Sequence, residues 1–169
     1  MSAPIELFRR LSTGVYVVGV AHQGRVNAFT AAWITQVSFD PLLVALSVNP
    51  ENFSHPLLKQ SRAFVLNVLR TEQLDLARHF GTQSGKDMDK LSGHRWHPGA
   101  LGAPVLDRAA AYLECRITGW TAAGDHEIVL AEAVGGGVID DTAEPMSYAQ
   151  TGDLDGSSAL YPRSFQEPS

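Results

Sequence analysis

The sequence is poor in several features that mark particular classes of protein. It has one cysteine, Cys115, in 169 residues, which excludes an internal disulfide framework and a metal site built from several cysteines. The formal net charge is −5 and there is no run of lysine and arginine, so we expect no nucleic-acid partner. The longest apolar runs, such as residues 41–48, are far shorter than the ~20 residues that cross a bilayer. Because an apolar signal stretch is also lacking near residue 1, we expect a cytoplasmic protein without membrane contact.

The short motifs of several familiar catalytic sites are absent as well. The sequence contains no G-x-G-x-x-G, no P-loop and no G-x-S-x-G. His94 and His97 flank Trp96, but no cluster of Cys, Asp or Glu completes a set of metal ligands, so we expect no metal. Cys115 lies in an apolar alternation typical of a core thiol. These absences leave no nucleophile or metal to carry the chemistry.

What is present is a series of short segments with strand-like patterns, separated by turn signals. Few helical stretches accompany them, which is typical of an antiparallel barrel or sandwich. We expect strands over residues 15–21, 26–38 (with an irregular join near 31–32), 42–48, 63–69, 109–118 and 126–134, and a bend at 135–137. We expect helices over residues 4–11, after a capping Ser54, and from a capping Thr71 to Gly81, followed by a long loop over 82–103. One domain over residues 1–152 and a polar tail or arm over 153–169 complete the expected organisation.

The stretch from Asn27 to His55 is the best candidate for binding a phosphorylated ligand. At Thr30-Ala31-Ala32, small residues let a ligand approach the backbone, where free N–H groups bind anions. The alternative is that these residues only fill a crowded barrel corner, and the residues alone favour it. Farther on, a helix that begins at Ser54 offers unpaired N–H groups and a positive dipole end. There the alternative is that Ser54 only caps its own helix.

A third candidate is His126, which opens a strand after the turn at Gly124-Asp125. A neutral imidazole at such a place can stack on a ligand or donate a hydrogen bond to it. Taken alone, such a histidine is more often a surface turn residue.

In their order and spacing, ten segments of the chain together resemble the flavin reductase-like family, the FMN-binding split barrels. This family includes the small reductase components of two-component flavin monooxygenases, and flavoredoxin. The resemblance covers roughly residues 8–152, in the segments 12–18, 27–33, 36–41, 46–48, 54–55, 64–69, 76–81, 102–106, 113–115 and 124–126.

The resemblance implies a mainly β, antiparallel split barrel with a few short flanking helices. It also implies a homodimer with one flavin per protomer near the interface between subunits, and His126 beside the flavin face where the nicotinamide docks. The implied cofactor-binding residues hold the phosphate (Thr30, Ala31, Ala32, Asn52, Ser54 and His55), follow the ring and ribityl chain (Asn27, Ala28, Phe29, Trp33, Ser47, Val48 and Asn49), or close the pocket (Phe80 and Gly81).

One position departs from the family pattern. Many members carry Arg or Lys two residues before the serine that is Ser54 here, whereas this chain has Asn52. A cationic clamp on the phosphate is therefore missing. Lys59, Arg62 and Lys86 are the candidate cations to replace it, and the N-terminus of the helix is a further candidate.

The function that the resemblance implies is hydride transfer from NADH or NADPH to FMN, with FAD as another flavin that could serve. Reduced flavin would then pass to a monooxygenase or another acceptor. The first alternative is a flavoredoxin-like FMN electron carrier that does not react with NAD(P)H. A second alternative is a split barrel that binds haem through a loop histidine.

Overall fold

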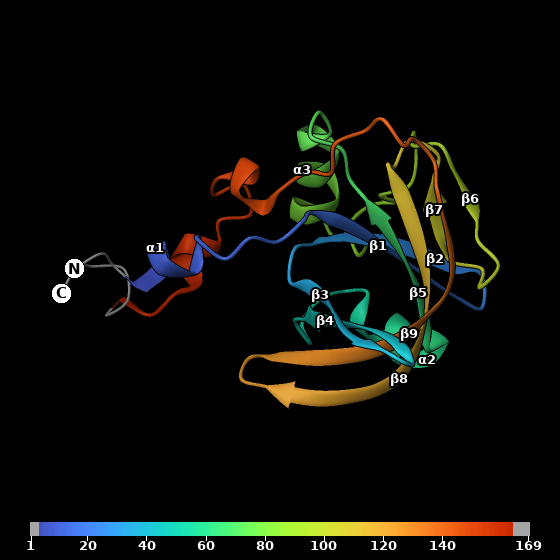
Figure 1. Ribbon diagram of the computed structural model, residues 1–169, viewed down its shortest axis with the longest axis horizontal. Helices are drawn as coiled ribbons and strands as arrows, with labels where there is room; N and C mark the ends of the chain where they lie inside the picture. Colours follow the sequence, from blue (N-terminus) through green and yellow to red (C-terminus); the bar gives the residue numbers. More distant parts are fainter. Residues whose placement is uncertain (1–3, 164–169) are drawn as a thin grey trace.

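Seven strands form one antiparallel sheet in the order β2-β1-β5-β8-β9-β4-β3, and the sheet curls around a buried core (Figure 1). The computed structural model describes residues 4–163. The strands of this sheet are β1 (Tyr16–His22), β2 (Arg25–Ala31), β3 (Ile34–Phe39), β4 (Leu42–Val48), β5 (Ala63–Val68), β8 (Ala111–Ala123) and β9 (His126–Val138). The expected mainly antiparallel β fold is confirmed.

The expected break in the second strand is also confirmed. Residues 32–33 separate β2 from β3, and the Ile34 N–H donates to the Ala32 carbonyl at 3.1 Å. β2 pairs with β1, whereas β3 pairs with β4. The join therefore carries the chain from one end of the sheet order to the other.

The hairpin of β8 and β9 is longer than the sequence predicted. The expected ends at Thr118 and Val134 are wrong, because the two strands stay paired from Ala111↔Val138 to Ala123↔His126. The expected bend at 135–137 lies inside β9, where the register shifts. Gly136 has φ +149, and a Cβ there would collide with the Tyr112 carbonyl oxygen. Glycine thus lets the strand bend without losing its partner.

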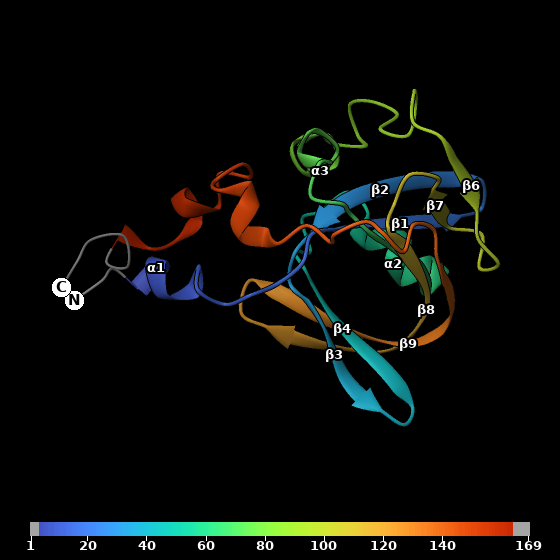
Figure 2. The same ribbon diagram turned by 45° about the horizontal axis from the view of Figure 1, so that its top comes forward.

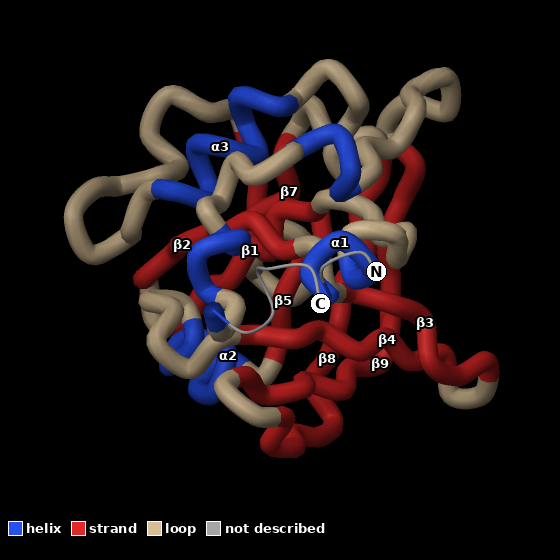
Figure 3. Tube along the Cα trace, turned by 90° about the vertical axis from the view of Figure 1, so that its left-hand side faces the viewer, coloured by secondary structure: helices blue, strands red, loops and turns tan. Residues whose placement is uncertain are grey.

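Residues 4–163 contain three α-helices, of which the second and third pack on the barrel, and their ends differ in part from the expected ones. They are α1 (Pro4–Phe8), α2 (His55–Ser61) and α3 (Leu74–Thr82), and two 3-10 helices, η1 (Tyr148–Thr151) and η2 (Ser157–Leu160), follow the last strand. The predicted cap at Thr71 is wrong, since Gln73 occupies the N-cap position of α3. Figure 3 shows α2 and α3 well apart on the barrel. No helix within residues 4–163 is long and apolar enough to cross a membrane.

The long segment after α3 is less irregular than expected. It includes β6 (Trp96–Pro98), which pairs with β7 (Pro104–Leu106). The buried carboxylate of Glu114 accepts the N–H groups of Ala100 and Leu101 at 3.0 and 2.7 Å. These bonds fasten the turn between β6 and β7 to the barrel.

The core has two main parts. Inside the barrel, Phe29, Leu46 and Phe64 are among the buried residues, and a second cluster below α3 includes Ala28 and Phe80. Cys115 belongs to the first cluster, as predicted. Burial raises the pKa of its thiol to about 12, and the nearby Glu114 charge adds to this effect.

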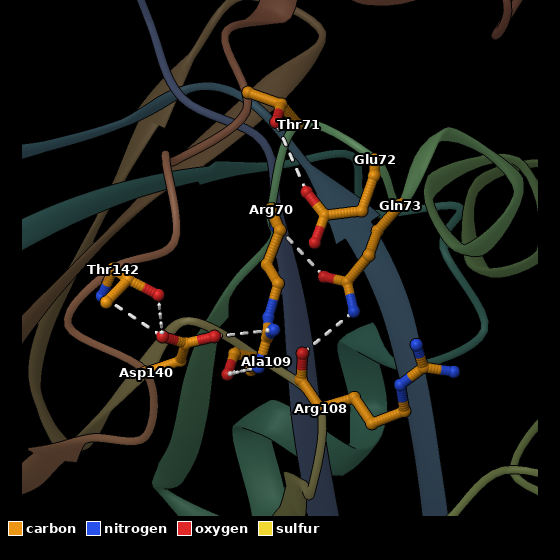
Figure 4. Close-up of polar contacts among 8 residues, drawn as sticks. All are labelled: Arg70, Thr71, Glu72, Gln73, Arg108, Ala109, Asp140 and Thr142. Atoms are coloured by element: carbon orange, nitrogen blue, oxygen red, sulfur yellow. Dashed lines mark hydrogen bonds and ion pairs between the residues drawn. The ribbon is translucent and has the colours of Figure 1, made fainter.

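Arg70 joins three segments beside the barrel (Figure 4). Its Nη1 lies 2.8 Å from Asp140 Oδ2, and its Nη2 donates to the Ala109 carbonyl at 3.3 Å. The Asp140 carboxylate also accepts the hydroxyl and N–H of Thr142. The end of β5 is thereby fixed to the chain that follows β9.

The two ends of the described chain pack together away from the barrel (Figures 1 and 2). The rings of Phe8 and Tyr161 lie 6.3 Å apart, and Arg9 pairs with Asp153 at 3.5 Å. The expected tail over 153–169 lies partly outside the described residues, which end at 163. Its role as an arm stays a prediction.

Candidate functional site

A hydrogen bond between two buried side chains connects the first and last parts of the predicted stretch. Asn27 Nδ2 donates to Ser54 Oγ at 2.8 Å, and the two residues are 3% and 0% exposed. The predicted cap at Ser54 is therefore wrong in its mechanism, because this hydroxyl makes no capping bond to α2. It joins α2 to β2 instead. Ala28 and Phe29, next to Asn27, are 0% and 5% exposed, so neither side chain is open to a ligand.

The join between β2 and β3 has the free donors that the sequence suggested. Within residues 4–163, the N–H groups of Ala32 and Trp33 donate to no backbone acceptor. Thr30 Oγ1 donates to the Ala77 carbonyl at 2.8 Å, which fixes α3 beside the join. A Cβ on Gly81 would lie 3.3 Å from Thr30 Cβ. The glycine thus lets α3 pack closely against Thr30.

An aromatic surface lies directly beside this join. The rings of Trp33 and His126 are 5.1 Å apart, and Trp33 is 47% exposed. The Ser47 N–H donates to the Trp33 carbonyl at 2.9 Å, which connects β4 to the join. His126 Nδ1 lies 2.8 Å from Asp125 Oδ1. The structure therefore brings Trp33, Ser47 and His126 together from three separate segments.

His126 also acts on its neighbour. Its hydrogen bond and then its charge lower the pKa of Asp125, whose side chain is exposed. An ionised Asp125 that accepts from Nδ1 leaves Nε2 as the free ring nitrogen. The imidazole is thus oriented before any ligand arrives.

The loop before α2 satisfies most of its own donors. Asn52 Oδ1 accepts the Ser54 N–H, and the Asn52 carbonyl accepts the His55 N–H, both at 2.9 Å. Asn49 Oδ1 accepts the Glu51 N–H. The Asn52 side chain therefore already binds the Ser54 N–H, which the sequence predicted to be free for a phosphate. This loop is less prepared for an anion than the join is.

A charged cluster that the sequence did not indicate anchors α2. His55 Nε2 and Lys59 Nζ lie 2.6 and 3.0 Å from Glu127 Oε2, and Lys59 Nζ lies 3.7 Å from the centre of the Trp120 ring. The hydrogen bonds from His55 and Lys59 lower the pKa of Glu127. Because 72 residues separate His55 from Glu127, no local pattern could have predicted this pair.

Phe80 and Gly81 have different surroundings. Phe80 is 1% exposed and packs in the core below α3, whereas Gly81 faces Thr30. Lys90, which the sequence did not single out, is buried here and donates to the carbonyls of Phe80 and Gln83 at 2.9 and 3.0 Å. Burial lowers the pKa of Lys90 to about 8. The end of α3 thus has a buried cation.

Of the three candidates to replace the missing cation, one lies next to Asn27. Lys59 is paired with Glu127, and Arg62 is the C-cap of α2, at the far end of that helix. Lys86 lines a cavity together with Asn27, Phe53 and Arg25. Arg25 was not predicted, because only the fold brings the β1–β2 turn to this place.

The sequence predicted no metal site because it has no cluster of Cys, Asp or Glu residues at the spacing of metal ligands. In the part of the chain that the structure describes, no group of three or more His, Cys, Asp and Glu residues is arranged to hold a metal ion.

Comparison with known proteins gives consistent matches. A sequence profile described as "Flavin reductase like domain" matches residues 8–156. The ferric-chelate reductase (NAD(P)H) of Archaeoglobus fulgidus is 31% identical over 147 residues, which is 86% of each chain. The high molecular weight rubredoxin of Moorella thermoacetica is 33% identical over 82% of this chain. The chain spans 21–61% of the length of three curated relatives, including this rubredoxin.

Solved structures support the same fold. The NADH:FAD oxidoreductase of Streptomyces globisporus superposes with a TM-score of 0.79 at 32% identity, covering 86% of each chain. A nitrilotriacetate monooxygenase component B homologue from Mycobacterium thermoresistibile gives a TM-score of 0.77 at 26% identity, covering 87% of this chain and 83% of that one. These neighbours confirm the predicted split barrel.

Proposed function

The chain belongs to the flavin reductase-like family, and from this premise we propose that it is an NAD(P)H-dependent flavin reductase that uses FMN. The observation that carries the proposal is the open join at 31–33, with two free N–H groups beside the paired rings of Trp33 and His126. Backbone donors next to an exposed aromatic surface suit a ligand that is both polar and planar.

The residues at the join fit a flavin. The Ala32 and Trp33 N–H groups are donors for its polar ring edge or its phosphate. Ala31 and Ala32 place only small side chains at the join. Thr30, Ser47, Val48 and Asn49 hold the surrounding backbone, and the Asn27–Ser54 bond sets the position of the 52–55 loop.

When bound, a flavin supplies the redox chemistry by accepting a hydride from a reduced nicotinamide. The chain's own residues orient and shield the two ring systems. Trp33 covers one side of His126, and Asp125 accepts from Nδ1, so that Nε2 of the neutral ring is free to accept from the carboxamide N–H of the nicotinamide. Buried core residues behind the join, such as Phe29 and Ile34, keep water from that side.

The same proposal includes a homodimer. Val37, Phe39 and Leu42 on the β3–β4 hairpin are 48%, 91% and 45% exposed, and Figure 2 shows this hairpin extending from the barrel. Exposed apolar side chains gathered on one hairpin are typical of a protein interface. Because β3 begins directly after Trp33, a partner docked there would lie close to the flavin. Phe39→Glu should give a monomer in analytical ultracentrifugation, whereas Arg95→Glu, at a side chain that is 87% exposed on the segment after α3, should not.

The similarity to a monooxygenase component B homologue supports a flavin-dependent monooxygenase as the acceptor of reduced flavin. Mixing the protein with such an enzyme and measuring substrate hydroxylation tests this part separately.

The central test is spectroscopic. The protein should bind FMN, and anaerobic addition of NADH or NADPH should bleach the visible flavin band at a rate that increases with protein concentration. Titrations with FMN and FAD, each followed by NADH and NADPH, give the preference. Flavin binding without bleaching by either nicotinamide would overturn the reductase proposal in favour of an electron carrier, and a red-brown protein would indicate haem.

A further inference from the structure

A cavity lies between the β1–β2 turn, the loop before α2 and the segment after α3. Its volume is about 360 Å³, within the range of small-molecule sites. Neither Trp33 nor His126 lines it. The residues that matter for its chemistry are Arg25, Phe53, Gly85, Lys86, Asp87 and Asp89.

Two cations and an aromatic ring face this cavity. The Arg25 guanidinium carbon lies 5.9 Å from the centre of the Phe53 ring, and Lys86 comes from the opposite segment. Within the described residues, neither Arg25 nor Lys86 has a carboxylate within salt-bridge distance. Both positive charges are therefore available to a ligand.

Two carboxylates also line the cavity. One oxygen of Asp89 accepts the Leu91 N–H at 3.0 Å, which leaves the other free, and the Asp87 side chain is exposed. Carboxylates accept hydrogen bonds from hydroxyl and amino groups. The lining therefore favours a ligand with both anionic and hydrogen-donating parts over a simple anion.

Gly85 fixes the wall that carries Lys86. A Cβ on Gly85 would lie 2.6 Å from Asn27 Oδ1, and Asn27 cannot move away because it is buried and bonded to Ser54. Only glycine allows this segment to close against β2. The cavity is thus built by close packing between β2 and the loop after α3.

We propose that this cavity binds the adenosine diphosphate half that FAD and NAD(P)H share. Phe53 provides a ring on which a purine stacks, Arg25 and Lys86 hold the phosphates, and Asp87 and Asp89 accept from the ribose hydroxyls. The inference rests on the proposed function, because that function requires a flavin or nicotinamide nucleotide.

The first experiment measures ADP binding to the full chain by isothermal titration calorimetry, with no flavin added. The unmodified protein should bind ADP, and Arg25→Ala and Lys86→Ala should each raise the Kd at least fivefold. Arg95→Ala is the matched control, since Arg95 is exposed and pairs only with Asp107, and its Kd should stay within twofold. Absence of ADP binding, or equal effects of all three variants, would overturn the proposal.

The second experiment identifies the source of the adenosine diphosphate. If it belongs to FAD, Lys86→Ala should weaken FAD binding at least fivefold while FMN binding changes less than twofold. If it belongs to the nicotinamide, the same variant should raise the KM for NADH at saturating FMN. Equal losses for FMN and FAD would reduce Lys86 to a phosphate clamp and contradict the proposal, as would no change in any of these constants. Because ADP binding is measured without turnover, failure of the bleaching test would leave this result intact.

Discussion

Asn27 and Ser54 form a buried hydrogen bond of 2.8 Å across 27 residues, and this bond positions the loop before α2 against β2. Substitution Asn27→Ala would leave the buried Ser54 hydroxyl without its donor. We expect a loss of about 1–3 kcal/mol in the free energy of unfolding, measured by urea denaturation. Thr35→Ala removes an exposed bond to the Gln36 carbonyl and should cost less than about 0.5 kcal/mol. Equal losses in the two variants would contradict the structural role of Asn27.

His126 should act on the nicotinamide and not on the flavin. In His126→Ala, the ring beside Trp33 is lost, so we expect kcat/KM for NADH to fall about tenfold. The Kd for FMN, measured by fluorescence quenching, should change less than twofold. His97→Ala is the control, because His97 is exposed and contacts Asp107 away from the join. Normal NADH turnover by the His126 variant would exclude the proposed role.

Lys90 should make stability depend on alkaline pH. Burial lowers its pKa from the ordinary value of 10.5 to about 8 in the folded protein, so between these values the unfolded chain binds one more proton than the folded chain. The free energy of unfolding should therefore rise with pH from about 8 to 10.5. Below pH 8, where Lys90 is charged in both states, the burial of this charge lowers the free energy of unfolding by its full amount.

The comparison for Lys90 is Lys90→Met, measured by urea denaturation across this pH range. The stability of the unmodified protein relative to this variant should increase between pH 8 and 10.5. Lys86→Met, at an exposed position in the same segment, should not show that trend. A constant difference between the unmodified protein and Lys90→Met would contradict a lowered pKa.

Cys115 should be unreactive in the folded protein. Its pKa of about 12 compares with 9.0 for a free thiol, which lowers the thiolate fraction about a thousandfold. At pH 8, Ellman's reagent should therefore label one thiol rapidly in urea and almost none in buffer. Rapid labelling of the native protein would show that the β5–β8 region opens readily.

Glu127 should contribute stability that disappears in acid. Its pKa is lowered by His55 and then by Lys59, so the contribution is present above the unfolded pKa of about 4.5 and is lost as the pH falls through the lower folded value. Glu127→Gln should therefore flatten the fall in Tm between pH 5 and 3. Glu132→Gln, which makes the same charge change on the same strand, should leave the slope unchanged.

The individual strands could be predicted because each has a local pattern of β-branched and apolar residues. The β2–β3 break was also predictable, since the alanines at 31–32 interrupt such a pattern. The ends of β8 and β9 were not, because their pairing extends through Gly135–Gly137, where the backbone bends and the partner strand decides the length. In the same way, Ser54 is a residue type typical of a helix cap. Its hydroxyl instead accepts a hydrogen bond from Asn27, which lies 27 positions earlier in the chain.

The sequence by itself determined the antiparallel architecture, the candidate stretch over residues 27–55 and the choice of His126, because these depend on residue type and near neighbours. Only the tertiary structure decided which of these residues meet. It placed Trp33 against His126, paired His55 and Lys59 with Glu127, and brought Arg25 and Lys86 to one cavity. The physical reason is that strand order and sheet curvature set distances between residues far apart in the chain, which no local pattern records.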